Sequence, residues 1–115
     1  MTLLFMRLFS GDIMEDMKTI DVQAREWFDR VYGNSYFSAR ITVNFGMPGE
    51  FEIRLPFEYG YGDYYKQATL KALQDIGLLL GITALWQARD KFGIIIRASK
   101  QEKCLKRDVV QWGTV

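Results

Sequence analysis

Tyrosines gather in two stretches of the sequence that are rich in turn-forming residues. Two of them flank Gly33-Asn34, and four more lie between positions 59 and 65. If both stretches lie at one end of the fold, their rings form a patch that could stack on bases or anchor a protein partner. The alternative is that some rings belong to the core while others are half exposed. The candidate partner-binding residues are Tyr32, Tyr36, Tyr59, Tyr61 and Tyr64.

Basic residues are concentrated in the second half of the chain, although the net charge of the whole is only +1. Residues 1–63 hold ten acidic against six basic side chains, whereas residues 64–115 hold four against nine. A row of cations can bind phosphates, and it can equally be a solvated face near the end of a strand. The candidate phosphate-binding residues are Arg89, Arg97, Lys100, Lys103, Lys106 and Arg107.

The segment Tyr59-Gly60-Tyr61-Gly62-Asp63 joins a predicted strand to a predicted helix, which is where phosphate-binding loops occur. It lacks the Gly-Lys-Ser/Thr sequence of such loops, and Asp63 would place a negative charge where a phosphate must lie. We therefore interpret it as a tight strand-to-helix turn in which Asp63 occupies the N-cap position.

The chain offers little for catalysis. It has no histidine and one cysteine, Cys104, which excludes imidazole bases, His-dependent triads, His metal ligands and an intramolecular disulfide. The acidic residues follow no recognisable spacing. We therefore expect a protein that is not an enzyme and that uses neither a metal nor a cofactor.

The elements that position these residues are predicted first from period-two alternation. Apolar and polar residues alternate over 37–45 and 51–57, and Gly46-Met47-Pro48-Gly49 between them predicts an antiparallel hairpin. Residues 19–28 begin with the same alternation, so a three-stranded meander is expected. The period then changes to that of a helix from Tyr65, ending at Gly77 or Gly81, which should pack across the apolar face of the sheet.

The remaining elements are less regular. Residues 83–92 predict a second short helix ended by Gly93, with a strand over 82–89 as the alternative. The β-branched run at 94–98 predicts a C-terminal strand, and 101–115 either adds a last strand or docks on the domain. The fold class is thus α+β: a three-stranded antiparallel meander packed by one main helix, then a second short helix and a C-terminal strand.

Residues 1–16 are expected to form an N-terminal extension of a single α+β domain at 17–115. The apolar run Leu3 to Phe9 is too short to span a bilayer, so no membrane association is expected. This segment is either a loosely attached extension, or it precedes a translation start at Met17. Alternatively, it packs on the domain as a helix or edge strand, which would cover its apolar side chains.

Four segments together resemble a group of short proteins encoded in bacteriophage and prophage genomes, and the resemblance covers residues 17–113. The segments are Trp27-Phe28-Asp29-Arg30, Gly33 to Ser38, Pro56 to Asp63 and Lys106 to Gly113. Most members of this group have no assigned function. The resemblance implies a viral or prophage origin and a bacterial cytoplasm as the place of action, and it brings no catalytic residues.

Three functions follow as hypotheses. The first is a non-catalytic binding protein that engages a host or phage protein, for instance to inhibit a host-defence or nucleic-acid-processing complex. The second is a small nucleic-acid-binding module that combines the basic C-terminal residues with tyrosine stacking. The third is an oligomeric structural or scaffold component.

Overall fold

The computed structural model describes residues 17–114, so the predictions made for residues 1–16 lie outside the described residues. The elements, in chain order, are β1 (Thr19–Asp29), β2 (Asn34–Val43), β3 (Phe51–Tyr59), α3 (Tyr64–Asp75), α4 (Trp86–Phe92), β4 (Ile95–Gln101) and α5 (Lys106–Trp112). The α+β fold class is confirmed, including the meander, the main helix, the second short helix and the later strand. In the part of the chain from 17 to 114, no helix is long and apolar enough to cross a membrane.

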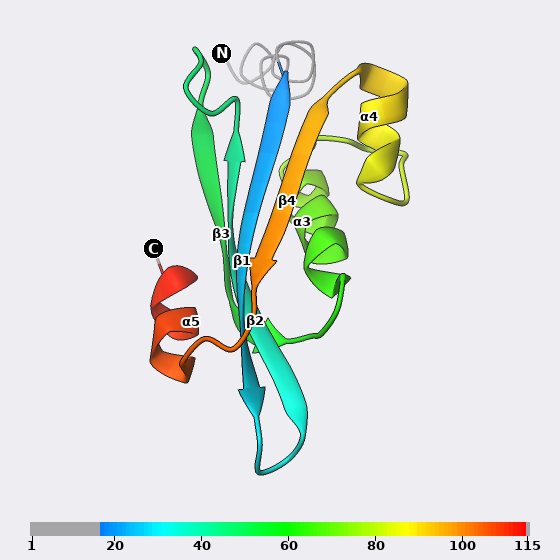
Figure 1. The fold of residues 1–115 in the computed structure, drawn as a ribbon. Coiled ribbons are helices and arrows are strands. Elements are labelled where there is room, and N and C mark those ends of the chain that lie inside the picture. Colours follow the sequence, from blue (N-terminus) through cyan, green and yellow to red (C-terminus); the bar gives the residue numbers. More distant parts are fainter. Residues whose placement is uncertain (1–16, 115) are drawn as a thin grey trace.

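The four strands form one sheet in the order β3-β2-β1-β4. β1 and β2 pair antiparallel from Ile20↔Val43 to Asp29↔Asn34, and β3 continues the meander on the other side of β2. β4 pairs with β1 in parallel, from Thr19↔Ile95 to Arg25↔Gln101. A parallel neighbour requires a crossover connection, and here that connection carries both α3 and α4 (Figure 1).

The two faces of the sheet are covered by different helices. Figure 1 shows α3 and α4 on one side of the sheet and α5 on the other; we call these sides the α3 face and the α5 face. The alternation predicted from the sequence points the apolar side chains to the α3 face, where they pack with Leu70 and Leu73 of α3. These buried strand residues are Ile20, Val22, Ala24, Phe37, Ala39, Ile41, Val43 and Leu55.

Both helices of the crossover end at glycines in the left-handed region. At the end of α3, Gly77 has φ 89°, and the N–H groups of Gly77 and Leu78 donate to the carbonyls of Gln74 and Leu73 (both 2.9 Å). This is a Schellman motif, so the predicted stop at Gly77 is confirmed. Gly93, with φ 69°, ends α4 in the same region, and the strand alternative for residues 82–89 is wrong.

The chain after β4 forms a helix rather than the last strand that we considered. α5 docks on the α5 face, where its Val109 is fully buried and its carbonyl accepts a hydrogen bond from the Ser38 hydroxyl (2.5 Å). The indole N–H of Trp112 donates to the carbonyl of Gln23 (2.7 Å). The guanidinium groups of Arg25 and Arg40 lie 3.9 and 3.7 Å from the centre of the same ring, a favourable cation–π arrangement.

The end of α5 approaches the sheet so closely that only glycine fits at position 113. A Cβ there would lie 2.5 Å from the carbonyl oxygen of Leu55 and 2.8 Å from the Cβ of Ser38. The φ of Gly113 is −90°, so any residue could adopt its backbone conformation, and the restriction is one of space alone.

We predict that Gly113→Ala lowers the free energy of unfolding by about 1–3 kcal/mol, because the added methyl group forces α5 away from β2 and β3. Chemical denaturation followed by circular dichroism measures this change. Gln111→Ala is the matched control, since Gln111 is exposed on the same helix and should change stability little. Equal stability of the two variants would contradict the close packing at Gly113.

Candidate binding groove beside strand β4

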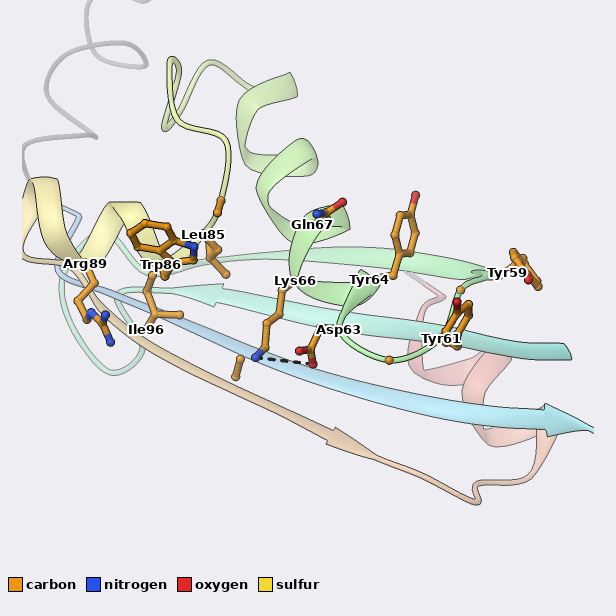
Figure 2. A pocket seen from close by; sticks show the side chains of 14 residues that line it. Tyr59, Tyr61, Asp63, Tyr64, Lys66, Gln67, Leu85, Trp86, Arg89 and Ile96 are labelled. Carbon is orange, nitrogen blue, oxygen red and sulfur yellow. Dashed lines mark ion pairs between the residues drawn. The ribbon is translucent and has the colours of Figure 1, made fainter.

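A concave surface lies on the α3 face, along strand β4. Ile96 and Ala98 of β4 form its floor, and its volume is about 1090 Å³. Figure 2 shows Trp86 at the α4 end, Tyr61 at the opposite end, and Lys66 with Asp63 between them. We call this surface the β4 groove.

Large aromatic side chains at the rim of the β4 groove are exposed. Tyr61 is 70% exposed and Trp86 is 56% exposed, and Tyr59 and Tyr64 are exposed as well. Trp86 was missed by sequence reasoning, which considered only the buried side of its helix. The presence of a tryptophan next to buried Leu85 was the available signal, because adjacent residues on a helix point in different directions.

The structure brings together only part of the predicted tyrosine patch. Tyr61 and Tyr64 line the β4 groove, and Tyr59 borders its end. Tyr59 pairs with Tyr36 across β2 and β3, and their rings meet edge-on at 5.9 Å on the α5 face, where Tyr36 also stacks on Phe57 with centroids 5.1 Å apart. Tyr32 is 78% exposed in the turn between β1 and β2 and does not line the groove.

The turn between β3 and α3 is held in place by its glycines. A Cβ at Gly60 would lie 2.7 Å from the ring of Tyr64 and 2.8 Å from that of Phe37, so glycine allows the turn to pack against the core. Asp63 occupies the N-cap position as expected, but its side chain makes no capping hydrogen bond. Instead its carboxylate lies 3.8 Å from the Lys66 ammonium.

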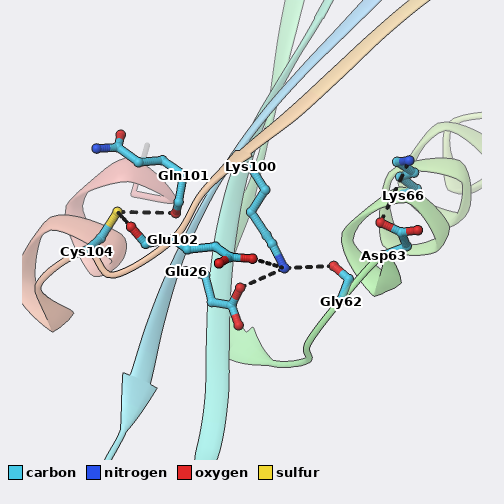
Figure 3. A network of polar contacts seen from close by, with 8 residues as sticks. All are labelled: Glu26, Gly62, Asp63, Lys66, Lys100, Gln101, Glu102 and Cys104. Atoms are coloured by element: carbon cyan, nitrogen blue, oxygen red, sulfur yellow. Dashed lines mark hydrogen bonds and ion pairs between the residues drawn. The ribbon is translucent and has the colours of Figure 1, made fainter.

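Lys100 of β4 fixes the same turn from the other side, as Figure 3 shows. Its ammonium lies 2.6 Å from the Glu26 carboxylate of β1, and both side chains are only 11–12% exposed. The ammonium also donates to the carbonyl of Gly62 (2.9 Å) and lies 3.9 Å from Glu102. We call Lys100, Glu26, Glu102 and the Gly62 carbonyl the Lys100 network.

Two further groups adjoin the Lys100 network. The ring of Tyr65 lies 5.9 Å from the Lys100 ammonium. Burial, and then the nearby Asp63 carboxylate, raise the pKa of Tyr65 above its ordinary value of 10.0, so the phenol stays neutral at physiological pH. Cys104, in the turn after β4, is the second group. Its backbone N–H donates to the Glu26 carbonyl (3.0 Å), and its thiol contacts the Gln101 carbonyl (3.4 Å). These two contacts hold the turn in place.

The six predicted phosphate-binding residues are distributed over both faces of the sheet. Arg89 lines the β4 groove, and Lys100 is held in its network. Arg97 makes two hydrogen bonds to the Asp21 carboxylate (2.6 and 2.9 Å), and Lys106 lies over the ring of Trp27 at 5.2 Å on the α5 face. The last two, Lys103 and Arg107, are exposed in the β4–α5 turn and on α5. These six side chains therefore do not form one continuous cationic surface.

The cations that line the β4 groove each lie beside a carboxylate. Asp63 faces Lys66, and Arg89 lies 3.2 Å from Asp90. Between residues 17 and 114, no three His, Cys, Asp or Glu side chains lie close enough together to hold a metal ion. The groove thus presents aromatic and aliphatic surface with a few compensated charges.

Comparison with known proteins adds no assignment: no family model, no curated protein and no solved structure matches the chain. The resemblance to phage and prophage proteins therefore stays a prediction from sequence motifs.

We predict that Lys100→Met lowers the free energy of unfolding by about 3 kcal/mol, because it leaves the Glu26 carboxylate buried without its cation. The double variant Lys100→Met, Glu26→Gln should recover part of that loss. Thermal and chemical denaturation of the two single variants and the double variant complete the cycle.

The matched control is Arg97→Met with Asp21→Asn, because that pair joins the same two strands on the α5 face but is more exposed, at 57% and 21% of the two side chains. Removing it should change stability little. Equal effects at the two pairs would contradict the role assigned to burial in the Lys100 network.

Proposed function

We propose that this chain is a non-catalytic binding protein whose β4 groove engages a segment of a host or phage protein. The observation that carries the proposal is the set of exposed aromatic rings around one open groove, together with Arg89. Trp, Tyr and Arg are the residues that most often dominate the energy of protein–protein interfaces.

The energetics of the rim favour a partner that covers it. A large aromatic side chain presents on the order of 150–250 Å² of surface. Burying the exposed half of such a ring contributes roughly 2 kcal/mol. Trp86 and Tyr61 stand at opposite ends of the groove (Figure 2), so one partner segment that reaches both gains both contributions.

The groove is also preorganised. Gly60 packs against Phe37 and Tyr64, and Lys100 holds the carbonyl of Gly62, so the turn that carries Tyr61 is anchored on both sides of that residue. A surface that is ordered before binding loses less conformational entropy when the partner arrives. Affinity at such a site can therefore come from a small number of rings.

The nucleic-acid alternative finds less support in the arrangement of charges. Binding of a phosphate backbone requires several cations along one path. Here Lys66 and Arg89, the cations of the groove, each have an acidic neighbour, and Arg97 is paired with Asp21. The aromatic rings remain, and these suit a protein partner as well as a base.

The resemblance to phage-encoded proteins supports a bacterial host protein as the partner, or another protein of the phage. A small domain without catalytic groups acts by occupying a surface. Inhibition of a host-defence or nucleic-acid-processing complex is accordingly the form of activity that we propose.

We predict that the immobilised protein captures a saturable partner from a lysate of the bacterium that carries its gene, and that Tyr61→Ala combined with Trp86→Ala abolishes the capture. The two truncations remove the aromatic surface at both ends of the groove. Quantitative mass spectrometry of the captured proteins measures the loss, and circular dichroism confirms that the variant folds.

The control is Tyr32→Ala combined with Val31→Ala, which removes exposed apolar side chains from the β1–β2 turn, away from the groove. This variant should keep the partner. A folded Tyr61, Trp86 double variant that retained every partner would refute the groove as the binding site, and a wild-type protein that captured none would refute the proposed function.

A further inference from the structure

The outer edge of β4 carries backbone groups that the sheet does not use. The N–H of Ile95 donates to the carbonyl of Lys18 (3.0 Å), and the parallel register continues from Thr19↔Ile95 to Arg25↔Gln101. In such a ladder, alternate residues direct both backbone groups to the neighbouring strand. The N–H and C=O groups of Ile96, Ala98 and Lys100 therefore point away from β1, and residues 17–114 provide no backbone partner for them.

The two edges of the sheet differ in how they are protected. β3, at the other edge, contains Pro56 and an irregularity in its pairing with β2 at Phe37/Ala39. Proline and bulges are the usual devices that prevent an edge strand from pairing with another chain. β4 has no proline and no irregularity over its seven residues, and its inward-pointing cation, Lys100, is ion-paired with Glu26. It is therefore the edge to which a further strand can be added.

The free edge adjoins the β4 groove directly. The side chains of Ile96 and Ala98 form the floor of the groove, and their backbone groups are the ones that point outward. A strand beside β4 would direct alternate side chains to the same face as these two residues. It would thus satisfy the backbone of the edge and fill the groove at once.

Positive charge at the start of β4 indicates which side chains an added partner strand should carry. Among residues 17–114, Lys18, Arg89 and Lys91 are exposed at this end, and the carboxylate of Asp90 lies 3.2 Å from Arg89. The salt bridges among residues 17–114 include neither Lys18 nor Lys91. An acidic side chain near this end of the added strand would therefore find complementary charge.

We infer that the partner binds by strand addition: an extended peptide segment of a second protein, acidic near the start of β4, pairs its backbone with Ile96, Ala98 and Lys100. Its alternate apolar side chains enter the β4 groove between Trp86 and Tyr61. The inference rests on the proposed function and specifies its partner as an extended strand, a known mode of peptide recognition in which backbone bonds give affinity and alternate side chains give specificity.

The test uses a displayed library of random ten-residue peptides, selected against the full-length wild-type protein. Selected peptides are resynthesised with N-methyl groups on alternate residues, in each of the two registers. Because only one register directs its N–H groups to β4, methylation in that register should weaken binding by about tenfold or more per methyl group. Methylation in the other register should be tolerated.

Amide hydrogen exchange of the protein gives an independent readout that needs no variant. On peptide binding, exchange should slow at Ile96, Ala98 and Lys100. It should change little at Arg97 and Ser99, whose N–H groups already bond to β1.

A variant of the protein tests the same edge. Ala98→Pro removes one outward donor without removing a bond to β1, and should lower the affinity for the peptide by about tenfold.

Three results would overturn strand addition. They are the absence of any selected peptide, equal sensitivity to methylation in both registers, and a dimer of the free protein that pairs β4 with β4 of a second copy and so occupies the edge. Some peptides could bind the Tyr61→Ala, Trp86→Ala double variant of the protein more weakly than the wild type, yet tolerate methylation in both registers. Such peptides would overturn strand addition and leave the proposed function of the groove intact.

Discussion

The buried ion pair between Lys100 and Glu26 joins three parts of the chain that are distant in sequence. Lys100 belongs to the last strand and Glu26 to the first, and the same ammonium bonds the Gly62 carbonyl in the turn before α3. β4 is an edge strand, and a parallel edge pair is slightly weaker per residue than an antiparallel one. Either charge of this ion pair would be costly to bury without the other. The pair therefore holds β4 both to β1 and to the turn before α3.

The rest of the site follows from that connection. Once β4 lies beside β1, the crossover that precedes it must place α3 and α4 on one face, and the space between α4 and the turn becomes the β4 groove. On the opposite face, α5 covers β1 to β3 through Val109, Trp112 and Gly113. The α5 face therefore contributes stability at its centre, and the α3 face, with its exposed aromatic rim, is the one on which we propose that a partner binds.

The sequence was sufficient for the elements whose periodicity is unambiguous. Alternation over three segments predicted the meander, and Gly77 and Gly93 ended the helices as expected, because few residues other than glycine adopt left-handed backbone there. Residues 101–115 were expected either to add a last strand or to dock on the domain, because the short apolar run at 109–112 does not by itself define a secondary structure. The tyrosine patch was predicted in part, since Tyr36 and Tyr61 belong to opposite faces. The pairing of Lys100 with Glu26 depends on the parallel register, which no local pattern reveals.

The central claim is that the Lys100 network fixes the turn at the end of the β4 groove, and nuclear magnetic resonance of Lys100→Met tests it most directly. The amide of Asp63 shares its peptide plane with the Gly62 carbonyl that Lys100 bonds. The account predicts shifted signals and faster motion at Tyr61, Gly62 and Asp63, with the amides of α5 unchanged. An unaltered turn, or a change spread evenly over the domain including α5, would contradict it.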